Sequence, residues 1–242
     1  MSITHIIYDC DGLLLDTETL HVQVNSAIAS RYDRTFTRDI HHAMIGRPAH
    51  QSMQILIDRL QLPLSVDQYM IERDRLITQL YPTSQPLPGA KELTFQLYCQ
   101  SIPQAIATSS SAPRFQQKMS CHQEWLDLFD CVVTGDDPAI AQGKPAPDIF
   151  LLTAERLGAL PHQCLVFEDS PAGVLAAKQA GMTAIVVPDP TMDRELFQLA
   201  DQILPSLLDF DPAHYVSSVK SNCPLPRPLS HFGRGEKTQE NR

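Results

Sequence analysis

The chain has 242 residues, of which 43% are hydrophobic and 19% are charged, a composition typical of a soluble globular protein with one good core and a smaller accessory domain. No apolar run approaches the roughly 18 residues that span a membrane, and the N-terminus lacks the basic region and apolar stretch of a signal peptide, so we expect a cytoplasmic protein. The net charge of −9 disfavours binding to nucleic acid or to an anionic membrane.

Short apolar runs predict buried strands, and helical patterns alternate with most of them. The runs are Ile3–Tyr8, Gln104–Thr108, Cys131–Thr134, Cys164–Phe167 and Ala184–Val187. This alternation favours an α/β fold, with an open parallel sheet covered by helices on both faces. The last predicted helix has clear limits, because Ser170 can cap its start, Pro171 takes the first helical position and Gly181 fits the position after its end.

The segment between the first two strands breaks this alternation, since it carries only helical patterns. Ser65 and Gln68, for example, form a capping box in front of one of them. Roughly four amphipathic helices here predict a separate helical cap, linked to the core by Asp16–Glu18 and by the Pro-rich segment Pro82–Gly89. The expected division is a catalytic core of residues 1–16 and 88–213, a cap of residues 17–87 and a tail of residues 214–242.

The tail differs from the rest of the chain in both composition and charge. It carries five Lys or Arg against two Glu, whereas residues 1–213 carry 14 Lys or Arg against 26 Asp or Glu. The tail is rich in Pro, then polar, and has no periodic apolar face, so we expect it to be disordered. A Pro-rich ligand for a partner protein is the alternative.

The six cysteines have neither CxxC nor CxxxC spacing. They are Cys10, Cys99, Cys121, Cys131, Cys164 and Cys223. This scatter favours reduced thiols over a metal or redox site.

Polar residues of complementary chemistry follow the predicted strands. They are Asp9 and Asp11, Thr108 and Ser109, Lys144 in a later loop, and Glu168 and Asp169. Each has an ordinary alternative explanation, as a turn former, a solvated lysine or an acid at a helix N-terminus. However, the carboxyl ends of parallel strands lie at one edge of a sheet, where ligands bind in open α/β folds. Together these residues predict one site with a nucleophile, an acid/base, hydroxyl groups, a cation and a third carboxylate for a metal.

Four motifs resemble those of a known family. They are Asp9-Cys-Asp-Gly-Leu-Leu-Leu-Asp-Thr-Glu, Thr108-Ser-Ser, Gly143-Lys-Pro-Ala-Pro and Glu168-Asp-Ser-Pro-Ala-Gly. In this order they resemble the haloacid dehalogenase superfamily, and most closely its pseudouridine-5′-phosphatase-like and β-phosphoglucomutase-like members. The resemblance implies a Rossmann-like core with a small helical cap. It also implies a monomeric, Mg²⁺-dependent phosphatase for a small phosphorylated metabolite, such as a sugar phosphate or a nucleoside monophosphate.

The resemblance assigns the chemical steps and the metal to three carboxylates. Asp9 would attack phosphorus and form an aspartyl-phosphate. Asp11 would protonate the leaving oxygen and then take a proton from water. The carboxylates of Asp9 and Asp169 and the carbonyl of Asp11 would bind Mg²⁺, which leaves water and phosphate oxygens to complete its shell.

The resemblance assigns phosphate binding and support to the remaining residues. Thr108, Ser109 and Lys144 would bind the phosphoryl group, and Glu168 would support the metal site. The candidates for substrate contact on the cap are His21, Arg47 and His50. An exposed position on the cap surface is the alternative explanation for each of them.

Two other functions are compatible with these residues. A phosphomutase uses the same core residues and differs in cap contacts that a single sequence does not reveal. A catalytically silent interaction module would keep the fold and act through its tail, but the complete set of site residues argues against it. Dehalogenase activity is disfavoured, because halide departure does not need the acid/base that Asp11 supplies.

Overall fold

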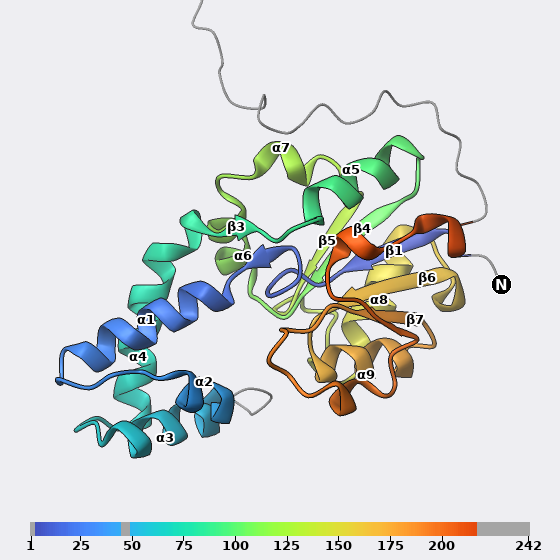
Figure 1. The fold of residues 1–242 in the computed structure, drawn as a ribbon. Helices are drawn as coiled ribbons and strands as arrows, with labels where there is room; N and C mark the ends of the chain where they lie inside the picture. The colour runs from blue at the N-terminus through green and yellow to red at the C-terminus, as the bar shows by residue number, and fades with distance from the viewer. Residues whose placement is uncertain (1–2, 45–48, 217–242) are drawn as a thin grey trace, which may run out of the picture.

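A computed structural model describes residues 3–44 and 49–216 of the chain, and its larger part is built on a six-stranded parallel sheet (Figure 1). The strand order is β5-β4-β1-β6-β7-β8. The strands are β1 (His5–Tyr8), β4 (Gln104–Thr108), β5 (Cys131–Thr134), β6 (Cys164–Glu168), β7 (Thr183–Val186) and β8 (Gln202–Ile203). The predicted parallel sheet is confirmed, and β8 adds a short strand at one edge.

Helices cover both faces of this sheet, as the alternating side chains of β1 show. Ile6 and Tyr8 belong to one hydrophobic layer, with α5, α6 and α7, whereas Ile7 belongs to the other, with α8 and α9. These helices are α5 (Ala90–Cys99), α6 (Ala112–Met119), α7 (Gln123–Leu126), α8 (Asp148–Leu157) and α9 (Pro171–Gln179). The two-residue period of a strand therefore places buried residues on both sides, and the predicted α/β class is confirmed.

Two predicted helix starts are confirmed by their hydrogen bonds. The Ser170 hydroxyl accepts from the backbone N–H of Gly173 at 3.1 Å in the first turn of α9. Ser65 and Gln68 exchange the two hydrogen bonds of a capping box at the start of α4 (Val66–Leu80). Gly181, just beyond α9, has a φ of +76°, the left-handed conformation that glycine favours after a helix.

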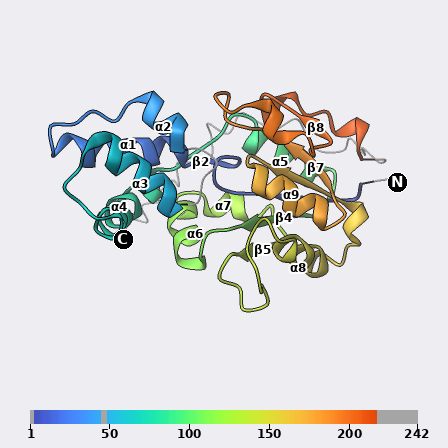
Figure 2. The same ribbon diagram turned by 90° about the horizontal axis from the view of Figure 1, so that it is seen from below.

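The chain between β2 (Leu15–Asp16) and β3 (Gln85–Pro86) forms a separate helical unit beside the sheet (Figures 1 and 2). Its helices are α1 (Glu18–Ser30), α2 (Arg38–Met44), α3 (Ala49–Leu60) and α4 (Val66–Leu80), followed by the short helix η1 (Tyr81–Thr83). Their apolar faces pack into a core of their own, so the inserted helical cap is confirmed. No helix in the described ranges is long and apolar enough to cross a membrane.

The two linkers of the cap pair with each other. Strand β2 (Leu15–Asp16) is antiparallel to β3 (Gln85–Pro86), and the N–H of Leu87 donates to the carbonyl of Leu14 at 2.9 Å. The sequence predicted the linkers Asp16–Glu18 and Pro82–Gly89 but not their pairing, because a strand pair of this length has no periodic pattern. The finding means that both ends of the cap leave the core at the same place.

The ordered chain extends beyond the predicted start of the tail. Val216 forms a parallel bridge with Ile3, and the Tyr215 hydroxyl donates to the side chain of Gln202 at 2.8 Å. The expectation of disorder is therefore wrong for residues 214–216, and residues 217–242 lie outside the described part. The short helices of this half are η2 (Pro161–Gln163), η3 (Arg194–Phe197), η4 (Leu207–Asp209) and η5 (Pro212–His214).

The expectation of reduced cysteines holds for four of the six. Cys10, Cys121, Cys131 and Cys164 are free thiols. Cys99 is disulfide-bonded, so the prediction is wrong for this residue. The sixth cysteine, Cys223, lies outside the described residues.

Candidate active site

Asp9 follows β1, the strand at which the order of strands in the sheet reverses. Strand β1 lies between β4 and β6, so the chain runs outward from it on both sides, and such a switch point opens a crevice at the carboxyl ends of the strands. Asp9 is the first residue after β1, and its backbone N–H donates to the carbonyl of Phe167 at 2.9 Å. Asp9 is only 6% exposed. The end of β6 thus fixes the first predicted carboxylate in the crevice.

Gly12 lets the loop after Asp9 approach the end of β6. Its φ is +82°, and a Cβ atom at this position would lie 2.2 Å from Oδ2 of Asp169. Any larger residue would therefore displace the Asp169 carboxylate, besides being strained in this conformation. The glycine of the first motif is required by the geometry of the site.

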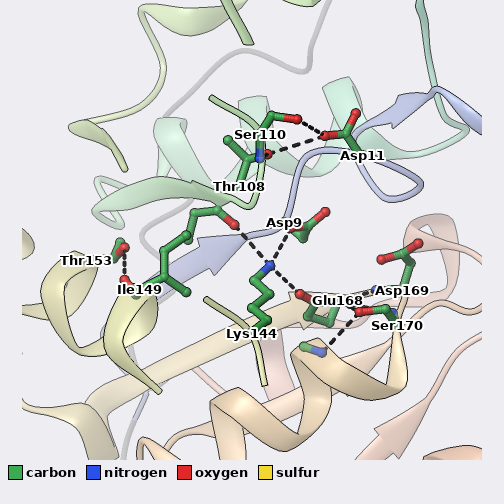
Figure 3. Close-up of polar contacts among 12 residues, drawn as sticks. Asp9, Asp11, Thr108, Ser110, Lys144, Ile149, Thr153, Glu168, Asp169 and Ser170 are labelled. Atoms are coloured by element: carbon green, nitrogen blue, oxygen red, sulfur yellow. Dashed lines mark hydrogen bonds and ion pairs between the residues drawn. The ribbon is translucent and has the colours of Figure 1, made fainter. Parts of the chain in front are cut away.

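The side chain of Lys144 is buried and lies at the centre of the polar contacts (Figure 3). Its Nζ atom is 2.5 Å from Oδ1 of Asp9 and 2.6 Å from Oε1 of Glu168, and it donates to the carbonyl of Ala107 at 3.3 Å. Burial alone would lower the pKa of Lys144, but the Asp9 and Glu168 carboxylates more than offset this effect and raise it. Lys144 is therefore a permanent cation beside the predicted nucleophile.

Glu168 is fully buried and is held on both oxygens. Oε1 accepts from Lys144, while Oε2 accepts from the backbone N–H groups of Asp169 and Ser170 at 3.0 and 3.1 Å, and from the Ser170 hydroxyl at 2.9 Å. A Cβ atom on Gly173 would lie 1.9 Å from this carboxylate. Glu168 therefore fixes both Lys144 and the turn that presents Asp169, as a supporting residue would.

The environment of the Asp169 carboxylate contrasts with that of the fully hydrogen-bonded Glu168 carboxylate. Among the described residues, no hydrogen-bond donor reaches its carboxylate, and burial together with the charges of Glu168 and Asp9 raises its pKa well above the ordinary value. The pKa of Asp9 is raised to about 7, chiefly by burial, although Lys144 opposes the shift. Asp9 and the half-buried Asp169 are thus two neighbouring carboxylates short of positive charge, and this is the electrostatic condition for a bound cation.

The donor set fits Mg²⁺ rather than a metal that needs many protein ligands. The site has four carboxylates, Asp9, Asp11, Glu168 and Asp169. Two lysines with buried side chains lie among them, Lys144 and Lys118, so the negative charges exceed the positive charges by two. No three His, Cys, Asp or Glu side chains of residues 3–44 and 49–216 converge on one metal position. Mg²⁺ is usually held by one or two carboxylates, with water and phosphate oxygens completing its octahedron, and that is what Asp9 and Asp169 offer.

Asp11 points away from Lys144, towards the end of β4 (Figure 3). Its Oδ2 accepts from the hydroxyl groups of Ser110 at 2.9 Å and Thr108 at 3.3 Å, and its Oδ1 lies 2.5 Å from Nζ of Lys118. Burial alone would raise the pKa of Asp11, but the charge of Lys118 and the hydrogen bonds from Lys118 and Ser110 lower it. Asp9 and Asp11 are therefore in contrasting environments although only one residue separates them.

Lys118 is a site residue that the sequence reasoning missed. It is only 3% exposed and shares the buried face of α6 with Phe115 and Met119. A lysine at the same helical spacing as two apolar core residues is the signal that could have revealed it. The structure also places Ser110, rather than Ser109, against Asp11.

Ser109 is the predicted residue with the least support from the geometry. Its side chain is exposed, and its backbone carbonyl lies close enough to Gly135 that a Cβ atom there would be 2.4 Å away. Thr108, in contrast, is fully buried, and its hydroxyl accepts from the N–H of Ser110 at 3.1 Å. The loop after β4 therefore offers backbone groups at Ser109 and hydroxyl groups at its two neighbours.

The cap forms the opposite wall of a cavity of about 430 Å³ above the site. Residues lining it include Glu18, His21, Asn25 and Arg73 from the cap and Asp169 and Ser170 from the core. Nδ1 of His21 is 2.8 Å from the Arg73 guanidinium, and the pKa of His21 is lowered to about 4, first by burial and then by Arg73. Of the predicted cap residues, His21 faces the cavity, His50 is exposed on α3, and Arg47 lies outside the described residues.

Comparison with known proteins decides the family. Residues 6–187 match the haloacid dehalogenase-like hydrolase family, a span that includes every core residue described above. The chain belongs to this family.

Relatives of this hydrolase family member are named as phosphatases. The chain is 43% identical over 219 residues to (DL)-glycerol-3-phosphatase 1, mitochondrial, of Arabidopsis thaliana, covering 88% of this chain and 74% of the relative. It is 38% identical over 216 residues to a Drosophila melanogaster protein provisionally named as a pseudouridine-5′-phosphatase, covering 88% and 94%. The predicted phosphoric monoester hydrolase is thereby confirmed.

A solved structure of similar fold supports the cap and core arrangement. A Thermotoga maritima protein, described provisionally as a β-phosphoglucomutase, has a TM-score of 0.71 and 29% identity, covering 84% of this chain and 94% of that one. The predicted resemblance to both the phosphatase-like and the mutase-like members is confirmed. The predicted cytoplasmic location and monomeric state remain predictions.

Proposed function

We propose that this protein is a Mg²⁺-dependent phosphatase that hydrolyses a small phosphorylated polyol, sugar or nucleoside through an aspartyl-phosphate. The observation that supports this proposal best is the contrast between two carboxylates at the end of β1. Asp9 is held by Lys144 and lies near Asp169, whose carboxylate no donor of the described residues reaches, whereas Asp11 is held on the other side by Lys118 and Ser110. One carboxylate is thus placed for bonding to phosphorus and a metal, and the other for proton transfer.

The proposed reaction has two displacement steps at phosphorus. In the first step an oxygen of Asp9 forms a bond to phosphorus, the ester P–O bond breaks, and the leaving alkoxide takes a proton from Asp11. This step requires Asp11 to be protonated when the substrate is bound, against the lowering of its pKa by Lys118 in the free chain. In the second step Asp11 takes a proton from water, the water oxygen bonds to phosphorus, and the bond to Asp9 breaks, which releases inorganic phosphate. The proton that Asp11 donates in the first step is regained in the second.

The fixed cations of the site would neutralise the charge that develops around phosphorus. Lys144 is held within 2.6 Å of Asp9 and Glu168, so it is already in place before a substrate arrives, and a preorganised charge loses nothing to reorganisation. Bound Mg²⁺, held by Asp9, Asp169 and the Asp11 carbonyl, would add Lewis-acid neutralisation of the phosphoryl oxygens. Thr108, with the backbone at Ser109, would orient the remaining oxygens.

The cap wall supports a hydroxylated substrate. Glu18, His21, Asn25 and Arg73 present both donors and acceptors to the cavity, which suits a molecule that carries hydroxyl groups rather than an apolar one. The two phosphatase relatives are named for glycerol 3-phosphate and pseudouridine 5′-phosphate, and both compounds are monoesters of polyhydroxylated molecules. Glycerol 3-phosphate is the first compound to test, because the relative named for it is 43% identical.

A panel of phosphate monoesters tests this proposal. Phosphate release should be measured for glycerol 3-phosphate, hexose phosphates and nucleoside monophosphates, with Mg²⁺ and with a chelator. We expect release from at least one class, abolition by the chelator, and no turnover by an Asp9→Asn variant that unfolds at the same temperature as the wild type. Retention of most activity by that folded variant would rule out the aspartyl-phosphate route.

A phosphomutase is the second candidate, because the solved structure at a TM-score of 0.71 is described as one. A mutase returns the phosphoryl group to the substrate instead of passing it to water. Incubation with β-glucose 1-phosphate distinguishes the two functions. The proposed phosphatase gives inorganic phosphate, whereas a mutase gives glucose 6-phosphate with little free phosphate.

A further inference from the structure

Helix α6 carries the one buried lysine of the described chain that contacts Asp11, and the same lysine also contacts the cap. Nζ of Lys118 lies 2.5 Å from Oδ1 of Asp11, 2.7 Å from the Ser110 hydroxyl and 4.7 Å from the centre of the Tyr81 ring. A hydrophobic residue here would avoid the desolvation of a charge. The lysine therefore needs a reason other than packing.

Its contacts separate Lys118 from the phosphoryl-binding part of the site. Lys144 contacts Asp9 and Glu168, whereas the polar partners of Lys118 are Asp11 and Ser110. Its ammonium group thus determines where the Asp11 carboxylate points, without lying beside the predicted nucleophile.

The third contact of Lys118 belongs to the cap. Tyr81 is 4% exposed and packs in the hydrophobic core of the helical insertion, and it begins η1, directly before β3 of the linker pair. Two further contacts link the α6 region to the same part of the cap. His122 Nε2 lies 2.8 Å from the carbonyl of Ser84, and Arg114 at the start of α6 pairs with Asp74 of α4.

We propose that Lys118 is a positioning residue that holds the acid/base Asp11 in place and couples this position to the cap through the ring of Tyr81. The inference rests on the proposed function, since it assumes that Asp11 transfers protons. A movement of the cap would carry the Tyr81 ring relative to Lys118. Because Lys118 is bound to Asp11, the carboxylate would reach its best position at only one placement of the cap.

The first test separates action through Asp11 from a general structural role. Lys118→Met should lower kcat by roughly 10²-fold, the loss that misplacement of a catalytic group by about 1 Å produces. KM should stay within about twofold, because no ground-state contact with substrate is removed. Arg114→Gln is the matched control, since it breaks an exposed contact of the same helix with the cap and should leave kcat within about twofold.

A double-mutant cycle keeps this test decisive even if Lys118→Met fails to fold with Asp11 left unpaired. The double variant Asp11→Asn/Lys118→Met carries no charge at this pair. In Asp11→Asn the amide oxygen and the Ser110 hydroxyl can still accept hydrogen bonds from the Lys118 ammonium, so both variants should fold. We expect the two to have the same kcat within about twofold, because Lys118 has nothing left to position. A further large loss in the double variant would mean that Lys118 acts independently of Asp11, and the inference would be wrong although the proposed function stands.

The second test addresses the coupling to the cap. Tyr81→Phe keeps the aromatic ring over Lys118 and should retain wild-type kcat. Tyr81→Leu removes it and should lower kcat roughly tenfold, and this loss should disappear in the Asp11→Asn background. Equal kcat for the two Tyr81 variants would overturn the coupling. A wild-type chain that releases no phosphate from the monoester panel would overturn both the inference and the proposed function.

Discussion

Without a metal, this protein should lose stability as the pH rises from about 4 to about 7, relative to its Asp9→Asn variant. The pKa of Asp9 is raised from 3.8 to about 7 in the folded chain, chiefly by burial. Between these two values the folded state keeps a proton on Asp9 that the unfolded state has released. Folding is therefore linked to proton uptake, and raising the pH through this window disfavours the folded state.

The size of the effect follows from the width of the window. Each unit of pKa difference corresponds to about 1.4 kcal/mol, so a shift of about three units costs about 4 kcal/mol at pH 7 and above. His21 has the opposite sign, because its pKa is lowered from 6.5 to about 4 and its neutral form is favoured in the fold. Its contribution rises with pH over that range, but it is the same in both chains and cancels in the comparison.

Urea unfolding of both chains in a chelator, at half-unit steps from pH 4.5 to pH 8, measures this difference. We expect the free energy of unfolding of the variant to exceed that of the wild type increasingly up to about pH 7, where the excess levels off. Addition of Mg²⁺ at pH 7.5 should stabilise the wild type far more than the variant, because the ionised Asp9 carboxylate is the better ligand for a hard cation. Parallel curves for the two chains would refute the statement that folding raises the pKa of Asp9.

Three further predictions follow from other parts of the site and fold. Asp11→Ala should lower kcat by roughly 10²–10⁴, the usual range for a general acid/base, while Mg²⁺ affinity, measured by calorimetry, changes little; a large loss of affinity with a mild effect on kcat would reverse this role. Gly173→Ala places a Cβ atom 1.9 Å from the Glu168 carboxylate and should destabilise the chain by about 1–3 kcal/mol, whereas an unchanged melting temperature would show that Glu168 is free to move. With reductant present, so that the disulfide of Cys99 does not enter the comparison, truncation after Val216 should leave melting temperature and kcat/KM unchanged, whereas truncation after Ala213 should lower the melting temperature; equal values for both would show that residues 214–216 add nothing.

Most of the core could be predicted because its signals are local. Strands buried on both faces read as continuous apolar runs, and a parallel sheet brings the residues after each run to one edge. These local signals place Asp9, Thr108 and Asp169 at one edge of the sheet, although more than half of the chain lies between Asp9 and Asp169. The caps of α9 likewise depend only on neighbouring residues.

The parts that escaped prediction depend on contacts between distant segments. Lys118 meets Asp11 only because α6 is rotated with its apolar face, and therefore its lysine, towards the sheet. Val216 forms a bridge with Ile3, near the other end of the chain. The Pro-rich composition that follows Val216 gives no sign of this contact. On the cap, the link between His21 and Arg73 joins α1 to α4, and no spacing within either helix indicates it.

The pairing of the two linkers has a consequence for how this chain tolerates change. Asp16 and Gln85 are opposite each other in an antiparallel pair, so their Cα atoms are only about 5 Å apart. From the side of the sheet, the entire helical insertion is a β-hairpin whose tip has been greatly enlarged. Helices within that tip can be lengthened, exchanged or reshaped without altering the distance that the host chain must bridge. The chemistry at the end of β1 and the choice of molecule presented to it can therefore diverge independently.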